Sequence, residues 1–312
     1  RETRVAILED DRLVELLVDR PDHRRIVGDI YLGRVEAVLP GIQAAFVDIG
    51  LEKSAFLHAS DLLEPEEDEE PGSEEGDEAF EEAGEDSTDL PDQEERRSRR
   101  RNGGGPVEPR QREVSSRRQL PDIADILKKG QTLLVQVTKE PISTKGCRVT
   151  AQISLPGRFL VYMPYASKVG VSRKIESKEL RGRLREMVSA SLPKDSGGMI
   201  VRTVAEGVTE DHFRREVESL LNLWRKVNRK KTFVRAPALV QRETSLTRGI
   251  IRDLFSAKVD SLHVDSKELY NEIEAYLKEA DPDLQSRVTS YNEPISLFDK
   301  FDIENEIRDL FK

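Results

Sequence analysis

The chain has 312 residues, 35% of them charged and 37% hydrophobic, and a formal net charge of −10 at neutral pH. A chain of this length usually forms two or three compact domains. Its single cysteine, Cys147, excludes an intramolecular disulfide framework and a zinc site built from several cysteines. No apolar stretch is long enough for a membrane span, and a single cysteine is typical of a reducing compartment, so we expect a cytoplasmic protein. We expect the side chain of Cys147 to fill a small apolar space in the core.

The negative charge is concentrated in one segment. Residues 64–95 contain eighteen Asp and Glu and no Lys or Arg, whereas residues 96–118 contain nine Arg and two Glu. The rest of the chain is nearly neutral, with 41 basic and 40 acidic residues. Residues 63–120 hold too few apolar side chains to offset the entropy lost on ordering, so we predict a disordered insertion. Its arginines are either simply solvated or make sequence-independent contacts with phosphate groups.

The segments before and after the insertion predict one β-barrel. Residues 1–19 alternate like a pair of strands, and a second group of strands follows them. The five short strands of this group are residues 30–39, 43–50, 51–57, 131–140 and 147–155. Five short strands with a Pro40-Gly41 turn and a long connection between the third and fourth are typical of an OB-type barrel. Such a barrel tolerates an insertion in a loop.

From residue 156 onward, helical and strand patterns alternate. The predicted strands are residues 157–166, 197–204, 237–243 and 258–266, and the predicted helices are residues 177–192, 209–231, 245–256 and 266–280. Thr209 is the expected N-cap of the long helix. The last four elements indicate an α/β unit that the N-terminal strands would complete. The barrel would then be inserted into a loop of a second domain.

Aromatic side chains on the predicted barrel strands indicate a surface for nucleic acid. Phe46 and Phe56 lie on neighbouring strands, and Tyr31 lies on the strand before them. OB barrels bind single strands by stacking bases on such rings, and Lys53 and Lys145 would add positive charge to the same face. A two-residue period does not distinguish the inside of a barrel from its outside. Phe46 and Phe56 are therefore either stacking platforms or part of the core.

The stretch GMIVRTVAEG, residues 198–207, ends an apolar strand with Arg202 and Thr203. A guanidinium donates two parallel hydrogen bonds to a phosphate group, and a neighbouring hydroxyl adds a third donor. From the residues alone, Arg202 belongs either to a phosphate site or to an exposed ion pair at the end of the strand.

Longer stretches resemble a known family. GDIYLGRVEAVLPGIQAAFVDIGLEKSAFLH resembles the S1 domain of the ribonuclease E/G family, and SLPGRFLVYMP, GVSRKIES, GMIVRTVAEG and YNEPISLFDKFDIENEI resemble its later parts in the same order. The resemblance covers nearly all of the chain except residues 63–120. It implies an α+β fold of several subdomains. An RNase H-like α/β subdomain (residues 1–27 and 247–312) would be interrupted by an S1-type OB-fold β-barrel (residues 28–150) and an α/β 5′-sensor region (residues 151–246).

The resemblance also implies a pocket for the 5′-monophosphate of RNA. The residues that match it are Arg202, Thr203, Gly157, Val161, Arg173 and Lys174. Arg202 and Thr203 would bind the phosphate, Gly157 would permit close approach of the nucleotide, and Val161 would contact the terminal base. Lys174 replaces a frequent second arginine of the family and would act only as a point charge. A pocket for one phosphate would exclude a triphosphate and leave its donors unpaired beside a 5′-hydroxyl.

The implied function is an endoribonuclease that processes rRNA and tRNA precursors and initiates mRNA decay by Mg²⁺-dependent phosphodiester hydrolysis. The implied Mg²⁺ ligands, an aspartate pair of a DNase I-like subdomain, and an implied Cys-x-x-Cys zinc link between subunits would follow residue 312. We therefore assign no catalytic or metal-binding residue to this chain. The implied partner is single-stranded RNA with a 5′-monophosphate, and the full-length protein would be a cytoplasmic homodimer or homotetramer. The alternatives are a non-catalytic S1-type RNA-binding protein and a scaffold that recruits partners through its acidic segment.

Overall fold

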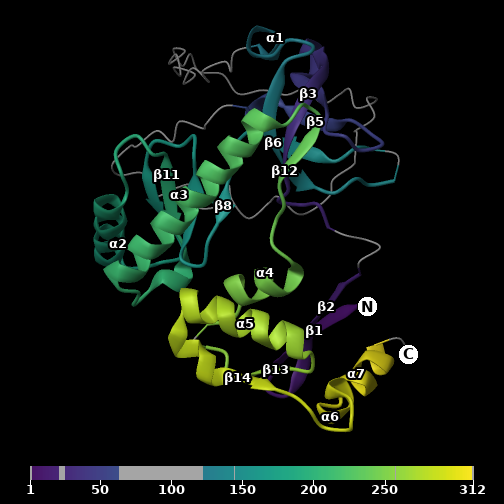
Figure 1. Cartoon of the computed structure of the whole chain (residues 1–312), viewed down its shortest axis with the longest axis vertical. Coiled ribbons are helices and arrows are strands. Elements are labelled where there is room, and N and C mark those ends of the chain that lie inside the picture. The colour runs from purple at the N-terminus through teal and green to yellow at the C-terminus, as the bar shows by residue number, and fades with distance from the viewer. Residues whose placement is uncertain (1, 21–24, 63–121, 144, 257, 311–312) are drawn as a thin grey trace, which may run out of the picture. The chain divides into compact units, whose positions relative to one another are not determined.

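The computed structural model describes residues 2–20, 25–62, 122–143, 145–256 and 258–310 (Figure 1). The predicted insertion, residues 63–120, lies outside the described residues. The other predicted elements fall within three regions of mixed helix and strand, which are treated in turn as the barrel, the central region and the terminal region.

The barrel is a closed, five-stranded sheet. Its elements are β3 (Ile30–Leu39), η2 (Pro40–Ile42), β4 (Ala44–Asp48), β5 (Ala55–His58), η3 (Ala59–Asp61), α1 (Ile123–Ile126), β6 (Thr132–Lys139) and β7 (Arg148–Thr150). The strands follow one another in the order β3-β4-β5-β7-β6, and β6 pairs back with β3. This closed arrangement is consistent with an OB-like fold and confirms the five predicted strands. Two strands are shorter than predicted. Residues 51–53 form a bend before the third strand, and the fifth ends at Thr150, so that Leu155 belongs to the neighbouring sheet.

Alternate residues of β3 face two different cores. Tyr31 and Val35 point into the barrel, where they contact the cluster that includes Cys147. Ile30 and Leu32 point outward and join the core of the central region. This is the two-residue period of a strand with both faces covered. Cys147 is fully buried, as expected of a small apolar filler, and burial raises the pKa of its thiol.

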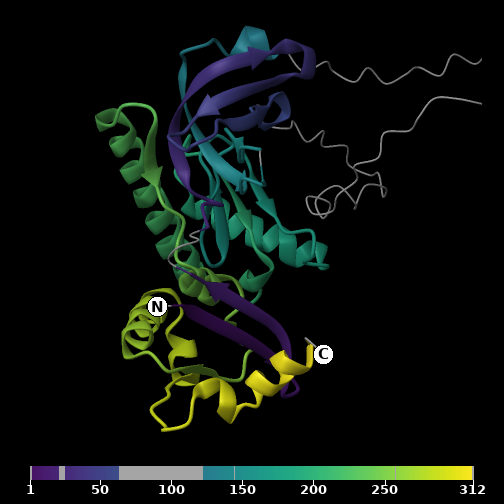
Figure 2. The same ribbon diagram turned by 90° about the vertical axis from the view of Figure 1, so that its right-hand side faces the viewer.

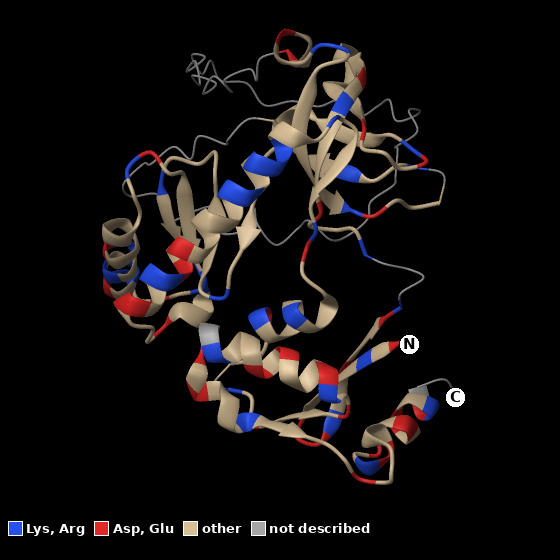
Figure 3. Cartoon of the chain, in the orientation of Figure 1, with Lys and Arg blue, Asp and Glu red and all other residues tan. Residues whose placement is uncertain are grey.

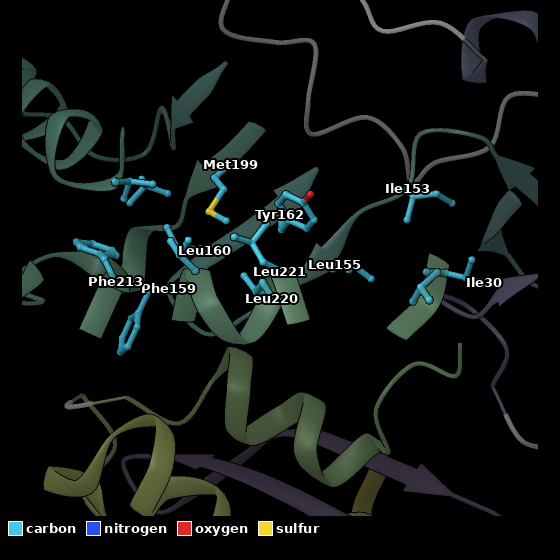
Figure 4. Packing of buried hydrophobic residues seen from close by; sticks show 14 of the residues in the cluster. Ile30, Ile153, Leu155, Phe159, Leu160, Tyr162, Met199, Phe213, Leu220 and Leu221 are labelled. Carbon is cyan, nitrogen blue, oxygen red and sulfur yellow. The ribbon is translucent and has the colours of Figure 1, made fainter. Parts of the chain in front are cut away.

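The central region is a four-stranded sheet with two helices packed on it. Its elements are β8 (Leu155–Pro156), β9 (Leu160–Met163), β10 (Val169–Val171), α2 (Lys178–Ser191), β11 (Gly198–Val201), η4 (Thr203–Ala205) and α3 (Glu210–Phe233). The strand order is β10-β11-β9-β8, with β10 and β11 parallel and the other pairs antiparallel. Figure 4 shows Met199, Tyr162 and Leu221 lying close together in the core between the sheet and α3.

The helices of this region begin as the sequence predicts. Ser177 caps α2, since its hydroxyl accepts a hydrogen bond from the amide of Leu180. Thr209 stands at the N-cap position of α3, but its hydroxyl bonds to Nδ1 of His212 at 2.7 Å and not to a backbone amide. Acidic residues in the first turn of α3 and lysines in its last turn complement the helix dipole.

The strand β12 (Ala238–Gln241) lies elsewhere than predicted. The sequence places it in the last α/β group, whereas it pairs antiparallel with the start of β3 at the barrel. There, β6 covers one edge of β3, while β4 pairs only from Arg34 onward and leaves the other edge for β12. Arg34 strengthens the junction by donating from Nη2 to the carbonyl oxygen of Ala236 at 2.8 Å.

The terminal region brings the two ends of the described chain together. Its elements are β1 (Thr3–Glu9), β2 (Arg12–Asp19), α4 (Leu246–Asp253), β13 (Leu262–Val264), α5 (Lys267–Ala280), η5 (Pro282–Arg287), β14 (Val288–Ser290), α6 (Leu297–Lys300) and α7 (Ile303–Leu310). Figure 2 shows the strand pair β1–β2 running beside the C-terminal helix α7. Arg4 of β1 donates to Glu304 of α7 at 2.8 Å, and the amide of Leu13 in β2 donates to Glu306 at 2.8 Å.

The strands of the terminal region form two separate pairs. Among the described strands, β1 pairs only with β2, and β13 pairs only with β14. The expected single sheet that joins the N-terminal strands to the last α/β group is therefore not formed, and the RNase H-like assignment stays a prediction. In the described part of the chain, no helix has both the length and the apolar character needed to cross a membrane.

Candidate functional site

One edge of the central sheet gathers the three segments that carry the predicted phosphate-binding residues. The strands β10 and β11 are parallel and in register, so residues 172–174 and 202–203 leave the sheet at the same edge. The antiparallel strand β9 begins at this edge, where the amide of Arg202 donates to the carbonyl oxygen of Phe159 at 2.8 Å. The fold therefore brings together residues that lie up to about 45 positions apart in the chain.

The guanidinium of Arg202 is already bound within the protein. Its Nη1 donates to the carbonyl oxygen of Gly157 at 2.8 Å and to Oδ1 of Asp253, the last residue of α4, at 2.6 Å. Its Nε and Nη2 make no hydrogen bond with the described residues, and 24% of the side chain is exposed. The ion pair considered from the sequence thus exists. An external phosphate that binds Arg202 would therefore find its Nη1 already bonded to Gly157 and Asp253.

Asp253 is held by two arginines. Arg252 donates from Nε and Nη2 to the two oxygens of Asp253 at 3.1 and 3.0 Å, and from Nη1 to Glu243 at 2.8 Å. Burial by itself would raise the pKa of Asp253, but the hydrogen bonds from Arg252 and Arg202 outweigh it, and the pKa lies below its usual value. Asp253 is therefore an anion at neutral pH and partly neutralises the charge of Arg202.

A second carboxylate, Glu216 of α3, lies against the turn before β9. It accepts hydrogen bonds from the amides of Arg158 and Phe159, the latter at 2.9 Å. Burial raises the pKa of Glu216 to about 7, against the lowering effect of these hydrogen bonds and of the Arg202 charge. A Cβ atom on Gly157 would lie 2.5 Å from Oε1 of Glu216. The close approach that Gly157 permits in this structure is therefore that of Glu216.

The remaining predicted residues lie along the same edge. Thr203 is exposed at the start of η4, and its hydroxyl makes no side-chain hydrogen bond within the described residues. Val161 is half-buried in β9, opposite Ile200 of β11. Arg173 and Lys174 are exposed just after β10. The six predicted residues therefore lie at or near one end of the sheet, and their binding of a phosphate stays a prediction.

The barrel presents a separate aromatic pair. Phe46 and Phe56 lie opposite each other on β4 and β5, with ring centroids 6.2 Å apart and ring planes at 68°. Phe46 is 37% exposed, whereas its neighbours Ala45 and Val47 are fully buried. The pair therefore lies on the outside of the barrel, which excludes the barrel core for both rings, whereas base stacking on them stays a prediction. Tyr31 does not join it, because this side chain is 7% exposed and lies in the barrel core.

Two lysines lie in adjoining loops of the barrel. Lys53, in the bend before β5, donates from Nζ to the carbonyl oxygen of Ser143 at 2.9 Å. Lys145 is exposed in the loop that leads to β7. The amide of Phe56 donates to the carbonyl oxygen of Cys147 at 2.8 Å, so this loop adjoins the strand that carries the aromatic pair.

Three residues of the sheet edge were not predicted from the sequence: Glu216, Arg252 and Asp253. Arg252 and Asp253 are about 50 positions from Arg202, and no spacing rule connects a helix end to a distant strand end. Glu216 gave one detectable signal. It stands between Phe213, Val217 and Leu220 on the apolar face of α3, where a carboxylate is out of place.

The resemblance implies metal ions for a longer protein, and the described residues do not supply a site for them. No group of three or more His, Cys, Asp and Glu side chains within the described ranges is arranged to hold a metal ion. Neither Mg²⁺ nor Zn²⁺ is therefore assigned to residues of this part of the chain.

Comparisons with known proteins show which family the chain belongs to. The model of the ribonuclease E/G family matches residues 154–312. The chain is 37% identical over 307 residues to Ribonuclease G of Haemophilus influenzae and 38% identical over 309 residues to Ribonuclease G of Salmonella typhimurium, covering 98% of this chain and 54% of each relative. It is 33% identical over 315 residues to Ribonuclease E of Synechocystis sp., covering 98% of this chain and 38% of that relative.

These alignments extend over almost the whole chain, although the chain spans only about half the length of the Ribonuclease G relatives. The family model alone covers half of the chain and includes the strand β11 and the residues Arg202 and Thr203. The chain belongs to the ribonuclease E/G family.

Proposed function

We propose that this chain is the part of an endoribonuclease that binds single-stranded RNA and senses its 5′-monophosphate. The observation that carries the proposal is the similarity, over 98% of the chain, to proteins named Ribonuclease G. Since the chain spans 54% of their length, hydrolysis belongs in the proposal to the whole protein. That protein would use Mg²⁺ held outside residues 1–312, act as a homo-oligomer in the cytoplasm on rRNA, tRNA and mRNA, and share a zinc link between subunits.

The barrel would hold the single strand. Phe46 offers an exposed ring beside Phe56, and bases of any sequence stack on such rings. Lys53 and Lys145 in the adjoining loops supply positive charge for the phosphodiester backbone. This combination favours binding without strict sequence preference.

The edge of the central sheet would hold the 5′ end. A terminal phosphate carries a charge of about −1.5 to −2 at neutral pH, compared with −1 for Asp253. It therefore competes with Asp253 for Arg202, takes the hydroxyl of Thr203 as a further donor, and meets Arg173 and Lys174 on the same edge. A 5′-hydroxyl has no charge with which to displace Asp253, so RNA without the phosphate gains nothing at this site.

The test compares RNA with a 5′-monophosphate and the same RNA with a 5′-hydroxyl. Arg202→Ala and Thr203→Val should lower the affinity for the first RNA and leave the affinity for the second nearly unchanged. Thr203→Val is the cleaner variant, because this hydroxyl makes no side-chain hydrogen bond within the described residues. An equal loss for both RNAs would reject the phosphate site. A non-catalytic RNA-binding protein would show the same binding, but its full-length form would not cleave RNA in the presence of Mg²⁺.

A further inference from the structure

The second half of α3 and the segment that follows it are unusually rich in positive charge. Residues 219–242 contain seven Lys and Arg and no Asp or Glu, although the chain outside residues 64–118 has almost equal numbers of the two kinds. Figure 3 shows the contrast along the helix: acidic and basic bands alternate near its start, and only basic bands follow toward the barrel. Such a one-signed surface attracts polyanions.

Four of these cations form one stripe on the outer face of α3: Arg225, Lys226, Arg229 and Lys230. They repeat at three- and four-residue intervals, opposite the buried side chains of the same helix. All four are exposed, and none makes an ion pair with another described residue. We call this stripe, together with Phe233, the outer face of α3.

The helix dipole does not account for the stripe. Cations stabilise a helix only within about its last turn, which here contains Lys230 and Lys231. Arg225 and Lys226 lie one to two turns earlier, where the dipole gives them no advantage.

Phe233 ends the stripe with an exposed aromatic ring. It is 78% exposed, the largest exposed fraction among the exposed large apolar side chains of the described residues. Arg229 and Lys230 precede it by four and three positions, so all three share one face. Aromatic rings flanked by cations are the surface on which single-stranded nucleic acids stack their bases.

The helix that carries the outer face connects the two regions that hold the proposed RNA sites. Near its start, α3 carries Glu216, which contacts the turn of Gly157 at the phosphate-binding edge. Beyond its end, Ala236 is bonded by Arg34 of the barrel. The helix rises about 26 Å over the 17 residues from Glu216 to Phe233.

We propose that the outer face of α3 binds the phosphodiester backbone of single-stranded RNA between the barrel and the edge of the central sheet, with a base stacked on Phe233. The proposal rests on the proposed RNA-binding function and assigns it a third contact region.

The test is a salt titration of RNA binding with the 312-residue chain. The probe is an oligonucleotide of about 20 nucleotides with a 5′-hydroxyl, longer than the 4–16 nucleotides that an OB fold covers. Each phosphate contact on a single strand contributes a slope of about −0.7 to the logarithmic salt dependence of the affinity. Arg225→Gln combined with Arg229→Gln should therefore reduce the slope by about 1.4. Between 50 and 200 mM salt, the unmodified chain should lose about seven-fold more affinity than this variant.

The matched control is Arg183→Gln combined with Arg185→Gln, two exposed arginines of α2. It removes the same charge and should leave the slope unchanged. Phe233→Ala should weaken binding at least about five-fold at constant salt slope, since it removes a ring and no charge. An unchanged slope in the α3 variant, or equal changes in both double variants, overturns the proposal.

The two proposals fail in different ways. If the 5′-hydroxyl and 5′-monophosphate RNAs bind equally while the α3 variant still changes the slope, the phosphate site is wrong and the outer face stands. If the two RNAs differ and the slope does not change, the outer face is wrong and the phosphate site stands. An unmodified chain that binds neither RNA overturns both.

Discussion

Arg202 and Asp253 form an ion pair of 2.6 Å between the end of β11 and the end of α4. The pair occupies the place at which we propose that a 5′-phosphate binds. In that proposal, the guanidinium of Arg202 would bind either Asp253 or the phosphate group of the RNA. The strength of the internal pair sets how much phosphate is needed to displace it.

Removing the charge of Asp253 should strengthen binding of 5′-monophosphorylated RNA. In Asp253→Asn, Arg202 keeps its bond to Gly157 but loses its competing anion. A hydrogen bond to a charged group is worth about 1.5–3 kcal/mol, so we expect the dissociation constant to fall on the order of ten-fold. Fluorescence anisotropy with labelled RNA measures this change.

The control for Asp253→Asn is Glu243→Gln, which removes a carboxylate bonded to Arg252 and not to Arg202. It should leave binding of the monophosphate nearly unchanged. If Asp253→Asn weakens binding, Asp253 positions Arg202 and does not compete with the phosphate.

The stability of the protein should fall as the pH rises from about 4.5 to 7. The pKa of Glu216 is raised to about 7 in the folded protein from an unfolded value of 4.5, so the folded state holds a proton in this window that the unfolded state has lost. This difference lowers the free energy of unfolding by up to about 3 kcal/mol across the window. Glu216→Gln should remove this part of the pH dependence. Urea unfolding at pH 5 and pH 7.5 gives the two values, and parallel pH profiles for both proteins would contradict the expectation.

Substitution of Gly157 should destabilise the fold through Glu216. In Gly157→Ala, the new Cβ would lie 2.5 Å from Oε1 of Glu216, and overpacking of this kind costs about 1–3 kcal/mol. The double variant Gly157→Ala, Glu216→Ala should recover part of this loss. Gly170→Ala is the control, since its nearest atom would be 3.7 Å away. Additive effects of Gly157→Ala and Glu216→Ala on the melting temperature would show that the two residues are not coupled.

Truncation of Phe46 and truncation of Tyr31 should affect different properties of the protein, the first RNA binding and the second stability. Phe46→Ala removes an exposed ring and should weaken binding of single-stranded RNA by about 1–3 kcal/mol with little change in melting temperature. Tyr31→Ala removes a buried ring and should lower the free energy of unfolding by about 3–5 kcal/mol. Paired binding and thermal unfolding measurements test both. A lower melting temperature in Phe46→Ala without weaker binding would assign this ring to packing.

The barrel and the helices were predictable because their signals are local. Each of these signals spans only a few neighbouring residues: the two-residue period of a strand, the glycine or proline of a turn, and the cap of a helix. Tyr31 shows the limit, because a strand pattern does not tell which of two alternating sets faces the core. Strand β12 shows another, since four residues contain no period that selects a partner strand.

The sequence predicts which residues lie at the edge of the central sheet, but it does not predict the hydrogen-bond partners of Arg202. Arg202 and Thr203 stand at the end of a strand, as the sequence indicates, and parallel pairing brings Arg173 and Lys174 to the same edge. The partners of Arg202 depend on the distance between β11 and α4, which only tertiary packing decides. The sequence could therefore state that an anion belongs beside Arg202, either a phosphate or a carboxylate of the chain, but it could not identify Asp253 as that carboxylate.

Helices most often kink at proline or glycine, and α3 contains neither of these residue types from Glu210 to Phe233. One of its ends is fastened to the sheet by Glu216, and the chain beyond the other end is fastened to the barrel by β12. The number of residues in α3 therefore sets the distance between these two attachments. An insertion of a single residue within it would rotate everything beyond the insertion by about 100° and push the two attachments about 1.5 Å further apart.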